Sequence, residues 1–195
     1  MLDVQRQTEK EVITAIDDNG ELYPINKWDA HVRNVPHLAV SVFLFNAGRL
    51  LLQQRADHKY HSGGLWANTC CSHPRWNESL ADCAERRLFE EVGCREIALT
   101  VFGKIAYKAK VGGTLYENEL AHCFVGHVVD DSLPTLFNRE EVQAVRWHDM
   151  AELRQDIKRN PDHYSKWIRI YIGQHYEMIS SVADGLPHTL EDQCL

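Results

Sequence analysis

The chain has 195 residues, of which 44% are hydrophobic and 25% are charged, as in an ordinary globular protein of one domain. It contains 21 Lys and Arg residues and 28 Asp and Glu residues, so the formal net charge is −7. This acidic balance argues against general binding to nucleic acid or to an anionic membrane, which requires a basic surface.

The first half of the chain is patterned mainly as strands. EVITAID at 11–17 predicts a strand that ends in an Asn-Gly turn. HLAVSVFLFN at 37–46 and RLLLQQR at 49–55 are apolar runs joined by Ala-Gly, which predicts a buried hairpin. LWANTCCSH at 65–73 predicts a shorter strand.

The clearest helix is predicted at 79–93. Ser79 and Asp82 form a capping-box pattern, and Gly93 is a typical C-cap. One face of this helix carries an apolar stripe of Leu80, Ala84 and Leu88.

Further elements follow this helix. We expect strands at 95–102, 104–110, 115–129 and 142–149, and helices at 150–159 and 165–182. This order predicts an α+β fold or a layered α/β/α arrangement. We expect residues 1–184 to form one domain and residues 185–195 to form a polar tail.

The N-terminal segment MLDVQRQTEKEV is polar, and no apolar stretch approaches the ~18 residues of a membrane helix. We therefore expect no secretory signal and no membrane insertion, and a cytoplasmic protein. Its six cysteines are then expected to be reduced, and no pair of them has C-x-x-C spacing. Cys70 and Cys71 are neighbours whose side chains would point to opposite faces of a strand, an arrangement that rarely forms a disulfide.

Cysteine, histidine and glutamate residues that could bind a metal or transfer a proton occur two positions apart in two segments. Cys71 and His73 alternate onto one strand face, and Glu117 and Glu119 do the same in YENEL. Three imidazoles and two carboxylates would suit a divalent metal of coordination number five or six. They are His31, His37, His73, Glu117 and Glu119. Each histidine taken alone also fits a role as an ordinary hydrogen-bonded group.

The predicted helix at 79–93 resembles the Nudix box, G-x5-E-x7-R-E-U-x-E-E-x-G-U, in which U is apolar. Ser72 replaces the first glycine and Arg87 replaces the first glutamate of the central motif. The positions that fit in spacing are Glu78, Arg86, Leu88, Glu90, Glu91, Gly93 and Cys94. Nudix hydrolases collect carboxylates around Mg²⁺ at this motif, so Arg87 exchanges a metal ligand for a phosphate-binding group. A solvated helix with Arg87–Glu91 ion pairs is the simpler alternative.

The combination of NTCCSHP, YENE, the arginine in the helix and SKW resembles the Nudix-type (type I) isopentenyl diphosphate isomerases over about residues 12–172. This resemblance implies a Nudix-like mixed β-sheet flanked by helices. It implies that isopentenyl diphosphate and dimethylallyl diphosphate are interconverted by protonation and deprotonation, a 1,3-allylic rearrangement in isoprenoid biosynthesis. The substrate would be a small-molecule diphosphate, and the oligomeric state is left open, with a monomer favoured.

The same resemblance implies roles for individual residues. Cys71 would be the catalytic cysteine and Glu119 the second acid–base residue. Tyr107 would hydrogen-bond to Glu119, and Trp167 would stabilise a nearby cation. Cys70 would only pack.

The resemblance also implies two groups of ligands. A divalent metal, Mn²⁺, Mg²⁺ or Zn²⁺, would bind at His31, His37, His73, Glu117 and Glu119. A Mg²⁺ ion that bridges to the diphosphate would bind at Glu91. The cations that would hold the diphosphate are Lys27, Arg55, Lys59 and Arg87.

Three other functions remain open from the residues. A Nudix diphosphohydrolase would release phosphate or a monophosphate, and it has no use for Arg87 or the pair of Cys71 and Glu119. A non-catalytic metal-binding module would have a purely structural metal, although structural zinc sites are usually four-coordinate and rich in cysteine. A Cys–His hydrolase built on Cys71 would require an oxyanion element that the sequence does not display.

Overall fold

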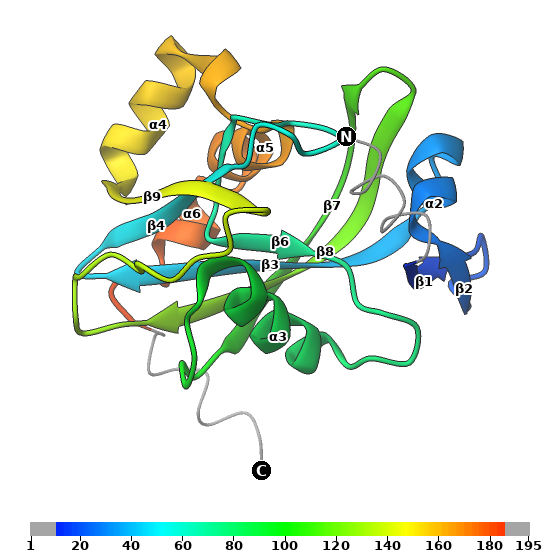
Figure 1. Cartoon of the computed structure of the whole chain (residues 1–195), viewed down its shortest axis with the longest axis horizontal. Coiled ribbons are helices and arrows are strands. Elements are labelled where there is room, and N and C mark those ends of the chain that lie inside the picture. Colours follow the sequence, from blue (N-terminus) through cyan, green and yellow to red (C-terminus); the bar gives the residue numbers. More distant parts are fainter. Residues whose placement is uncertain (1–10, 186–195) are drawn as a thin grey trace.

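Every strand of the computed structural model, which describes residues 11–185, belongs to one mixed β-sheet (Figure 1). The strands are β1 (Val12–Ile16), β2 (Leu22–Asn26), β3 (His37–Asn46), β4 (Arg49–Arg55), β5 (Trp66–Ala67), β6 (Cys70–Ser72), β7 (Thr100–Gly112), β8 (Leu115–His127) and β9 (Val142–Asp149). The helices are α2 (Lys27–Arg33), α3 (Leu80–Val92), α4 (Met150–Arg159), α5 (Lys166–Gln174) and α6 (Tyr176–Ser180), with a 3-10 turn at Pro161–His163.

β3 is the central strand. It pairs in parallel with β8, from His37 opposite Glu119 to Phe45 opposite His127. On its other side it pairs antiparallel with β6, where Ser41 lies opposite Cys71. Strands paired on both sides and covered on both faces are built from nearly continuous apolar residues, which explains the run HLAVSVFLFN. The same pairings bring Cys71 of β6 and Glu119 of β8 next to β3.

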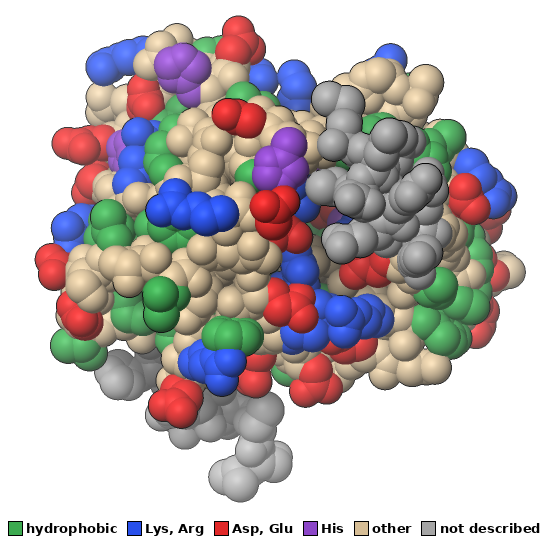
Figure 2. All heavy atoms as spheres, in the orientation of Figure 1, with side chains coloured by type: hydrophobic (Ala, Val, Ile, Leu, Met, Phe, Trp, Pro, Cys, Tyr) green, Lys and Arg blue, Asp and Glu red, His purple; other side chains and the backbone are tan. Residues whose placement is uncertain are grey.

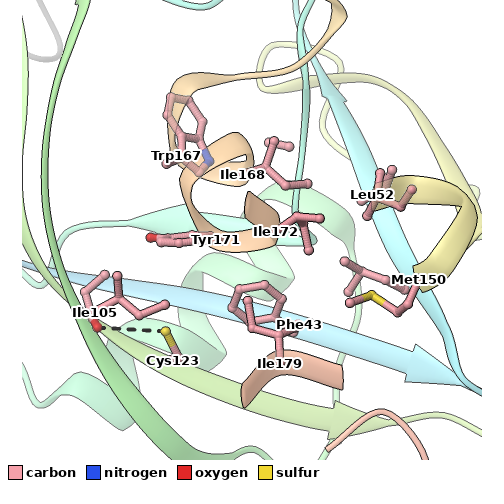
Figure 3. Close-up of a cluster of buried hydrophobic side chains, with 14 of the residues drawn as sticks. Phe43, Leu52, Ile105, Cys123, Met150, Trp167, Ile168, Tyr171, Ile172 and Ile179 are labelled. Carbon is pink, nitrogen blue, oxygen red and sulfur yellow. Dashed lines mark hydrogen bonds between the residues drawn. The ribbon is translucent and has the colours of Figure 1, made fainter. Parts of the chain in front are cut away.

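Two hydrophobic cores lie on opposite faces of the sheet. Phe43 packs with Tyr171 and Ile172 of α5 and with Ile179 of α6 (Figure 3). On the other face, Val42 and Leu44 pack with Ala84 and Leu88 of α3. Burying one apolar face of each helix against the sheet produces an α/β/α layering. The predicted mixed sheet with flanking helices is confirmed.

The predicted strand at 65–73 is wrong in one respect, because it is interrupted. Asn68 and Thr69 separate β5 from β6. The Asn68 amide donates to Val42 O and Cys70 O, at 3.1 and 3.2 Å. The Thr69 hydroxyl donates to Leu51 O and accepts from Leu44 N, at 2.7 and 2.9 Å. These side-chain bonds to the backbone replace ladder bonds and break the strand.

The predicted helix at 165–182 is also divided in two. The chain leaves helical geometry at His175, with φ −124° and ψ 22°, so α5 and α6 are separate helices. Gly173, the weakest helix former of the segment, lies two residues earlier. The break turns α6 so that Ile179 reaches the core.

Other boundaries differ from the predictions as well. The strands expected at 95–102 and 104–110 are replaced by one strand, β7, which begins only at Thr100. Its pairing with β8 continues along its length, with register shifts near Gly103 and between Lys110 and Gly112. β2 and α2 were not predicted from the sequence. The polar tail and the N-terminal segment lie outside the described residues, apart from Glu11, Val12 and Gly185, and the single domain at 1–184 stays a prediction.

The surface agrees with the composition. On the face shown in Figure 2, acidic and basic side chains are interspersed. Among the described residues, no helix is both long enough and apolar enough to cross a membrane.

Candidate active site

The residues that the sequence singles out converge at one pocket beside β3. All of the predicted catalytic, metal-binding and diphosphate-binding residues line it except His31 and His37, which lie fully buried next to it. The predicted residues in the lining are Lys27, Arg55, Lys59, Cys71, His73, Arg87, Glu91, Tyr107, Glu117, Glu119 and Trp167. They come from α2, β4 and its following loop, β6 and the residue after it, α3, β7, β8 and α5, so only the tertiary structure assembles them.

Cys71 presents its thiol to this pocket and is held by two polar neighbours. Its Sγ donates to Asn68 Oδ1 at 3.0 Å and lies 3.3 Å from Ser41 Oγ, which is 2.8 Å from Tyr171 Oη. Burial raises the pKa of the Cys71 thiol well above its ordinary value, so the thiol stays protonated at neutral pH. Cys70 faces the other way and packs against α3, as predicted.

Glu119 is held from two sides. The Tyr107 hydroxyl donates to Oε2 of Glu119 at 2.7 Å, and Nε2 of His73 lies 2.9 Å from Oε1. Burial, together with the charge of Glu117, raises the pKa of the Glu119 carboxyl well above its ordinary value. Glu119 can therefore carry a proton inside the pocket.

Four residues form a cluster with the geometry of a metal site. His31, His37, His73 and Glu117 each offer one ligand atom, and these atoms lie within 4.8 Å of one another. Nδ1 of His31 bonds to Lys27 O at 2.7 Å, and Nδ1 of His37 bonds to Val35 O at 2.8 Å. These bonds aim both Nε2 atoms into the cluster, as the outer partners of metal-binding histidines do.

The protonation states in this cluster also suit a metal. Burial lowers the pKa of His37 to about 4 and that of His73 well below its ordinary value, so both imidazoles are neutral. Burial opposes ionisation of Glu117, but His31 and His61 lower its pKa well below the ordinary value.

Nε2 of His31 lies 3.2 Å from Oε2 of Glu117, yet neither atom has a hydrogen-bond partner, and nor does Nε2 of His37. Buried lone pairs without partners are costly unless they bind a cation. The donor set therefore fits a divalent metal. Glu119, the fifth predicted ligand, lies at the edge of the cluster, with Oε1 4.0 Å from Nε2 of His37.

Three of the four predicted diphosphate-binding cations are paired with carboxylates. Lys27 Nζ lies 2.8 Å from Glu11, and Lys59 pairs with Glu141. Arg87 donates to Glu91 and Glu90 at 2.6 and 2.7 Å. Glu91 also accepts from Gln53 at 2.9 Å. The fourth cation, Arg55, lies over the ring of Trp167, with its Cζ 5.2 Å from the ring centroid.

Sequence reasoning missed several residues of the site. Tyr60, His61, Ser72 and Glu141 line the pocket, and Nε2 of His61 lies 3.0 Å from Oε1 of Glu117. Ser41, Asn68 and Tyr171 hold the Cys71 thiol as described above. His61 follows the predicted anion-binding Lys59 by two residues, which is a weak signal in the sequence. Asn68 and Ser72 belong to the NTCCSHP motif, where no role was predicted for them. The other residues carry no local signal, because their neighbours come from distant segments.

Known proteins resemble the chain along most of its length. A NUDIX domain model matches residues 35–169. An isopentenyl-diphosphate Delta-isomerase of Cereibacter sphaeroides (strain KD131) is 44% identical over 160 residues, which cover 82% of this chain and 90% of that protein. The one from Dinoroseobacter shibae is 45% identical over 170 residues, which cover 87% and 96%.

Solved structures share the fold. The structure of DR0079 from Deinococcus radiodurans has a TM-score of 0.69 at 13% identity and covers 84% of this chain and 98% of its own. A MutT protein from Methanosarcina mazei has a TM-score of 0.56 at 18% identity, covering 73% and 93%. The chain therefore belongs to the isopentenyl-diphosphate Delta-isomerases of the NUDIX family, as its motifs predicted.

Proposed function

We propose that this pocket interconverts isopentenyl diphosphate and dimethylallyl diphosphate, with Cys71 and Glu119 as the two proton-transferring groups. The observation that carries the proposal is that a thiol and a carboxyl, both buried and both able to hold a proton, line the same pocket. That pocket also gathers the cations expected to bind a diphosphate.

The reaction moves a double bond by adding one proton and removing another. Protonation of the terminal alkene carbon leaves positive charge on the tertiary carbon, and loss of a proton two carbons from the protonated atom forms the new alkene. One of Cys71 and Glu119 starts protonated and the other ionised, and the two transfers exchange these states. Proton exchange with solvent then restores the starting states.

The pocket walls would protect the positive charge that develops on the substrate. The ring of Trp167 is 3% exposed and already attracts the Arg55 guanidinium. An aromatic face close to the substrate would stabilise a developing cation in the same way. Burial of Tyr107 and Trp167 also excludes water, which would otherwise trap the cation as an alcohol.

The diphosphate would bind to Lys27, Arg55, Lys59 and Arg87. All four line the pocket and would supply the local positive charge that a diphosphate requires, in a chain whose net charge is −7. Arg87 replaces a carboxylate of the Nudix box, and this exchange suits binding of a diphosphate better than its hydrolysis.

Two metal sites belong to the proposal. His31, His37, His73 and Glu117, with Glu119 beside them, would hold a divalent metal, for which three imidazoles favour Mn²⁺ or Zn²⁺ over Mg²⁺. When bound, this metal would supply positive charge that keeps Glu117 ionised and holds Glu119 in orientation. Glu91, which lines the pocket, would hold a Mg²⁺ ion at the diphosphate.

We also propose a cytoplasmic protein. The five cysteines of the described residues are free, and the proposed chemistry requires Cys71 as a free thiol. A reducing compartment maintains that state. The monomeric state expected from the sequence stays a prediction.

The proposed roles of Cys71 and Glu119 can be tested by Cys71→Ala and Glu119→Gln. Each change should lower turnover of isopentenyl diphosphate at least about a hundredfold, because each removes one proton transfer. Turnover would be followed in D₂O with added Mg²⁺ and Mn²⁺, as dimethylallyl diphosphate that carries deuterium. Circular dichroism should show that both variants keep the fold.

Cys70→Ala is the matched control, because Cys70 is the same residue type at the next position but packs on the opposite face. It should retain most of the activity. Near-normal turnover in Cys71→Ala or Glu119→Gln would overturn the assignment, and release of phosphate would point instead to diphosphate hydrolysis.

A further inference from the structure

His61 is a buried histidine that the proposed mechanism does not use. It lies in the loop between β4 and β5, and its side chain is 4% exposed. The loop is closed by hydrogen bonds from Arg55 N to Leu65 O at 3.0 Å and from Gly64 N to Arg55 O at 3.1 Å. A Cβ atom at Gly63 would lie 2.3 Å from Asp57 O, so the loop backbone packs too tightly for a side chain there. His61 is therefore presented from a well-defined loop.

The ring of His61 contacts Oε1 of Glu117, the carboxylate oxygen that points away from His31. Its Nε2 lies 3.0 Å from Oε1 of Glu117, while Oε2 of the same carboxylate lies 3.2 Å from Nε2 of His31. The other oxygen–nitrogen distances from Oε2 are 4.0 Å to His37 and 4.0 Å to His73. The two oxygens of Glu117 are thus divided between His61 and the cluster of three histidines.

The neighbours of His61 fix which ring nitrogen carries the proton. Its Nδ1 lies 3.3 Å from Ser62 Oγ, whose hydroxyl can donate to it. Nε2 then carries the hydrogen and donates it to Glu117. The ring edge of His61 also meets Trp167 at a centroid distance of 6.0 Å and an interplanar angle of 89°, which limits rotation of the ring.

We propose that His61 is a positioning residue for the metal site, which donates a hydrogen bond to Oε1 of Glu117 and so would leave Oε2 of this carboxylate available to the metal. The inference rests on the metal site of the proposed function and adds a residue to its outer shell. His61 lies outside the group of residues whose ligand atoms lie within 4.8 Å of one another, so it acts through Glu117 and not as a ligand. Outer partners of this kind typically change metal affinity about 10–100-fold.

The test measures Mn²⁺ binding to the metal-stripped full-length protein by calorimetry. His61→Leu removes the donor at similar volume and should weaken Mn²⁺ binding about 10–100-fold. His61→Gln places an amide N–H near the position of Nε2 and should remain within about threefold of the wild type. His61→Asn carries the same amide on a shorter stem and should bind as weakly as His61→Leu, which provides a second comparison if the leucine variant does not fold.

His58→Gln is the matched control, because His58 lies in the same loop but is 39% exposed and pairs with Glu140 outside the pocket. It should bind Mn²⁺ as the wild type does. Pulsed electron paramagnetic resonance should detect three histidine nitrogens on Mn²⁺ in both the wild type and His61→Gln.

Three results would overturn the inference. His61→Leu and His61→Asn could bind Mn²⁺ with wild-type affinity, His61→Gln could be as weak as His61→Leu, or His61→Gln could lose one histidine nitrogen, which would make His61 a direct ligand. In each case the proposed metal site would stand. Failure of the wild type to bind Mn²⁺ would overturn the site itself and the inference with it.

Discussion

Two adjacent arginines of α3 have different surroundings. Arg86 donates to Glu78 and Glu90, at 2.6 and 2.9 Å, and lies outside the pocket lining. Arg87 lines the pocket and donates to Glu91 at 2.6 Å. One residue of offset along a helix turns a side chain by about 100°, so neighbouring residues of the same type can have unrelated roles.

Arg87→Gln should raise the KM for isopentenyl diphosphate about 10–100-fold, because a charge-assisted bond to the diphosphate is lost. Steady-state kinetics would measure the change. Arg86→Gln serves as the control and should leave KM within about twofold. Equal effects of the two substitutions, or an unchanged KM in Arg87→Gln, would contradict the role of Arg87.

At the scale of elements, the first turns of α5 carry side chains of the candidate site, and its last turn contains a residue with low helix propensity. Trp167 and Tyr171 face the pocket and the buried Ser41, whereas Gly173 lies in the last turn. A Cβ atom at Gly173 would have no heavy atom within 4 Å. Glycine lowers helix stability relative to alanine because it loses more backbone entropy on folding.

Gly173→Ala should therefore raise the free energy of unfolding by about 0.5–1 kcal/mol and the melting temperature by a few degrees, with turnover unchanged. Thermal unfolding measures the effect. Gly126→Ala is the opposite case, because its Cβ would lie 2.8 Å from both Ile97 Cγ2 and Leu44 Cδ2. It should destabilise the protein by about 1–3 kcal/mol. A melting temperature of Gly173→Ala at or below that of the wild type would contradict this effect of Gly173 on helix stability.

At the scale of the whole molecule, Glu141 links three segments that are distant in sequence. It lies just before β9 and pairs with Lys59 of the loop after β4 and with Arg87 of α3. Burial opposes its ionisation, but Lys59 and Arg87 lower the pKa of Glu141 to about 2, from an ordinary value of 4.5. A carboxyl with a lowered folded-state pKa stabilises the fold above its ordinary pKa and loses this contribution as the pH falls through the folded value.

Glu141→Gln should therefore lower the free energy of unfolding at pH 6 by on the order of 1–3 kcal/mol, since one pKa unit corresponds to about 1.4 kcal/mol. The difference from the wild type should shrink as the pH falls from about 4.5 towards 2. Urea unfolding of both proteins across this range measures it. A difference that stays constant with pH would show that Glu141 does not act through its charge.

The sequence by itself determined what depends on residues close together in the chain. The caps of α3 at Ser79 and Gly93 follow from local hydrogen bonding and backbone preference, and both are present. The hairpin of β3 and β4 follows from two apolar runs joined by Ala-Gly. The shared face of Glu117 and Glu119 follows from the two-residue period of β8. Cys71 and His73 also line one pocket, although β6 ends at Ser72 and His73 lies just beyond it. These patterns sufficed to indicate the family and its candidate ligands.

Only the tertiary structure decided how these local pieces meet. The parallel pairing of β3 with β8 brings His37 opposite Glu119, and it joins segments about eighty residues apart. The strand break at Asn68 and the contact of His61 with Glu117 also depend on partners from distant segments. Such contacts depend on the packing of the whole sheet, whereas spacing along the chain constrains only neighbours. The sequence therefore indicated the candidate ligands but not the residues that hold them in place.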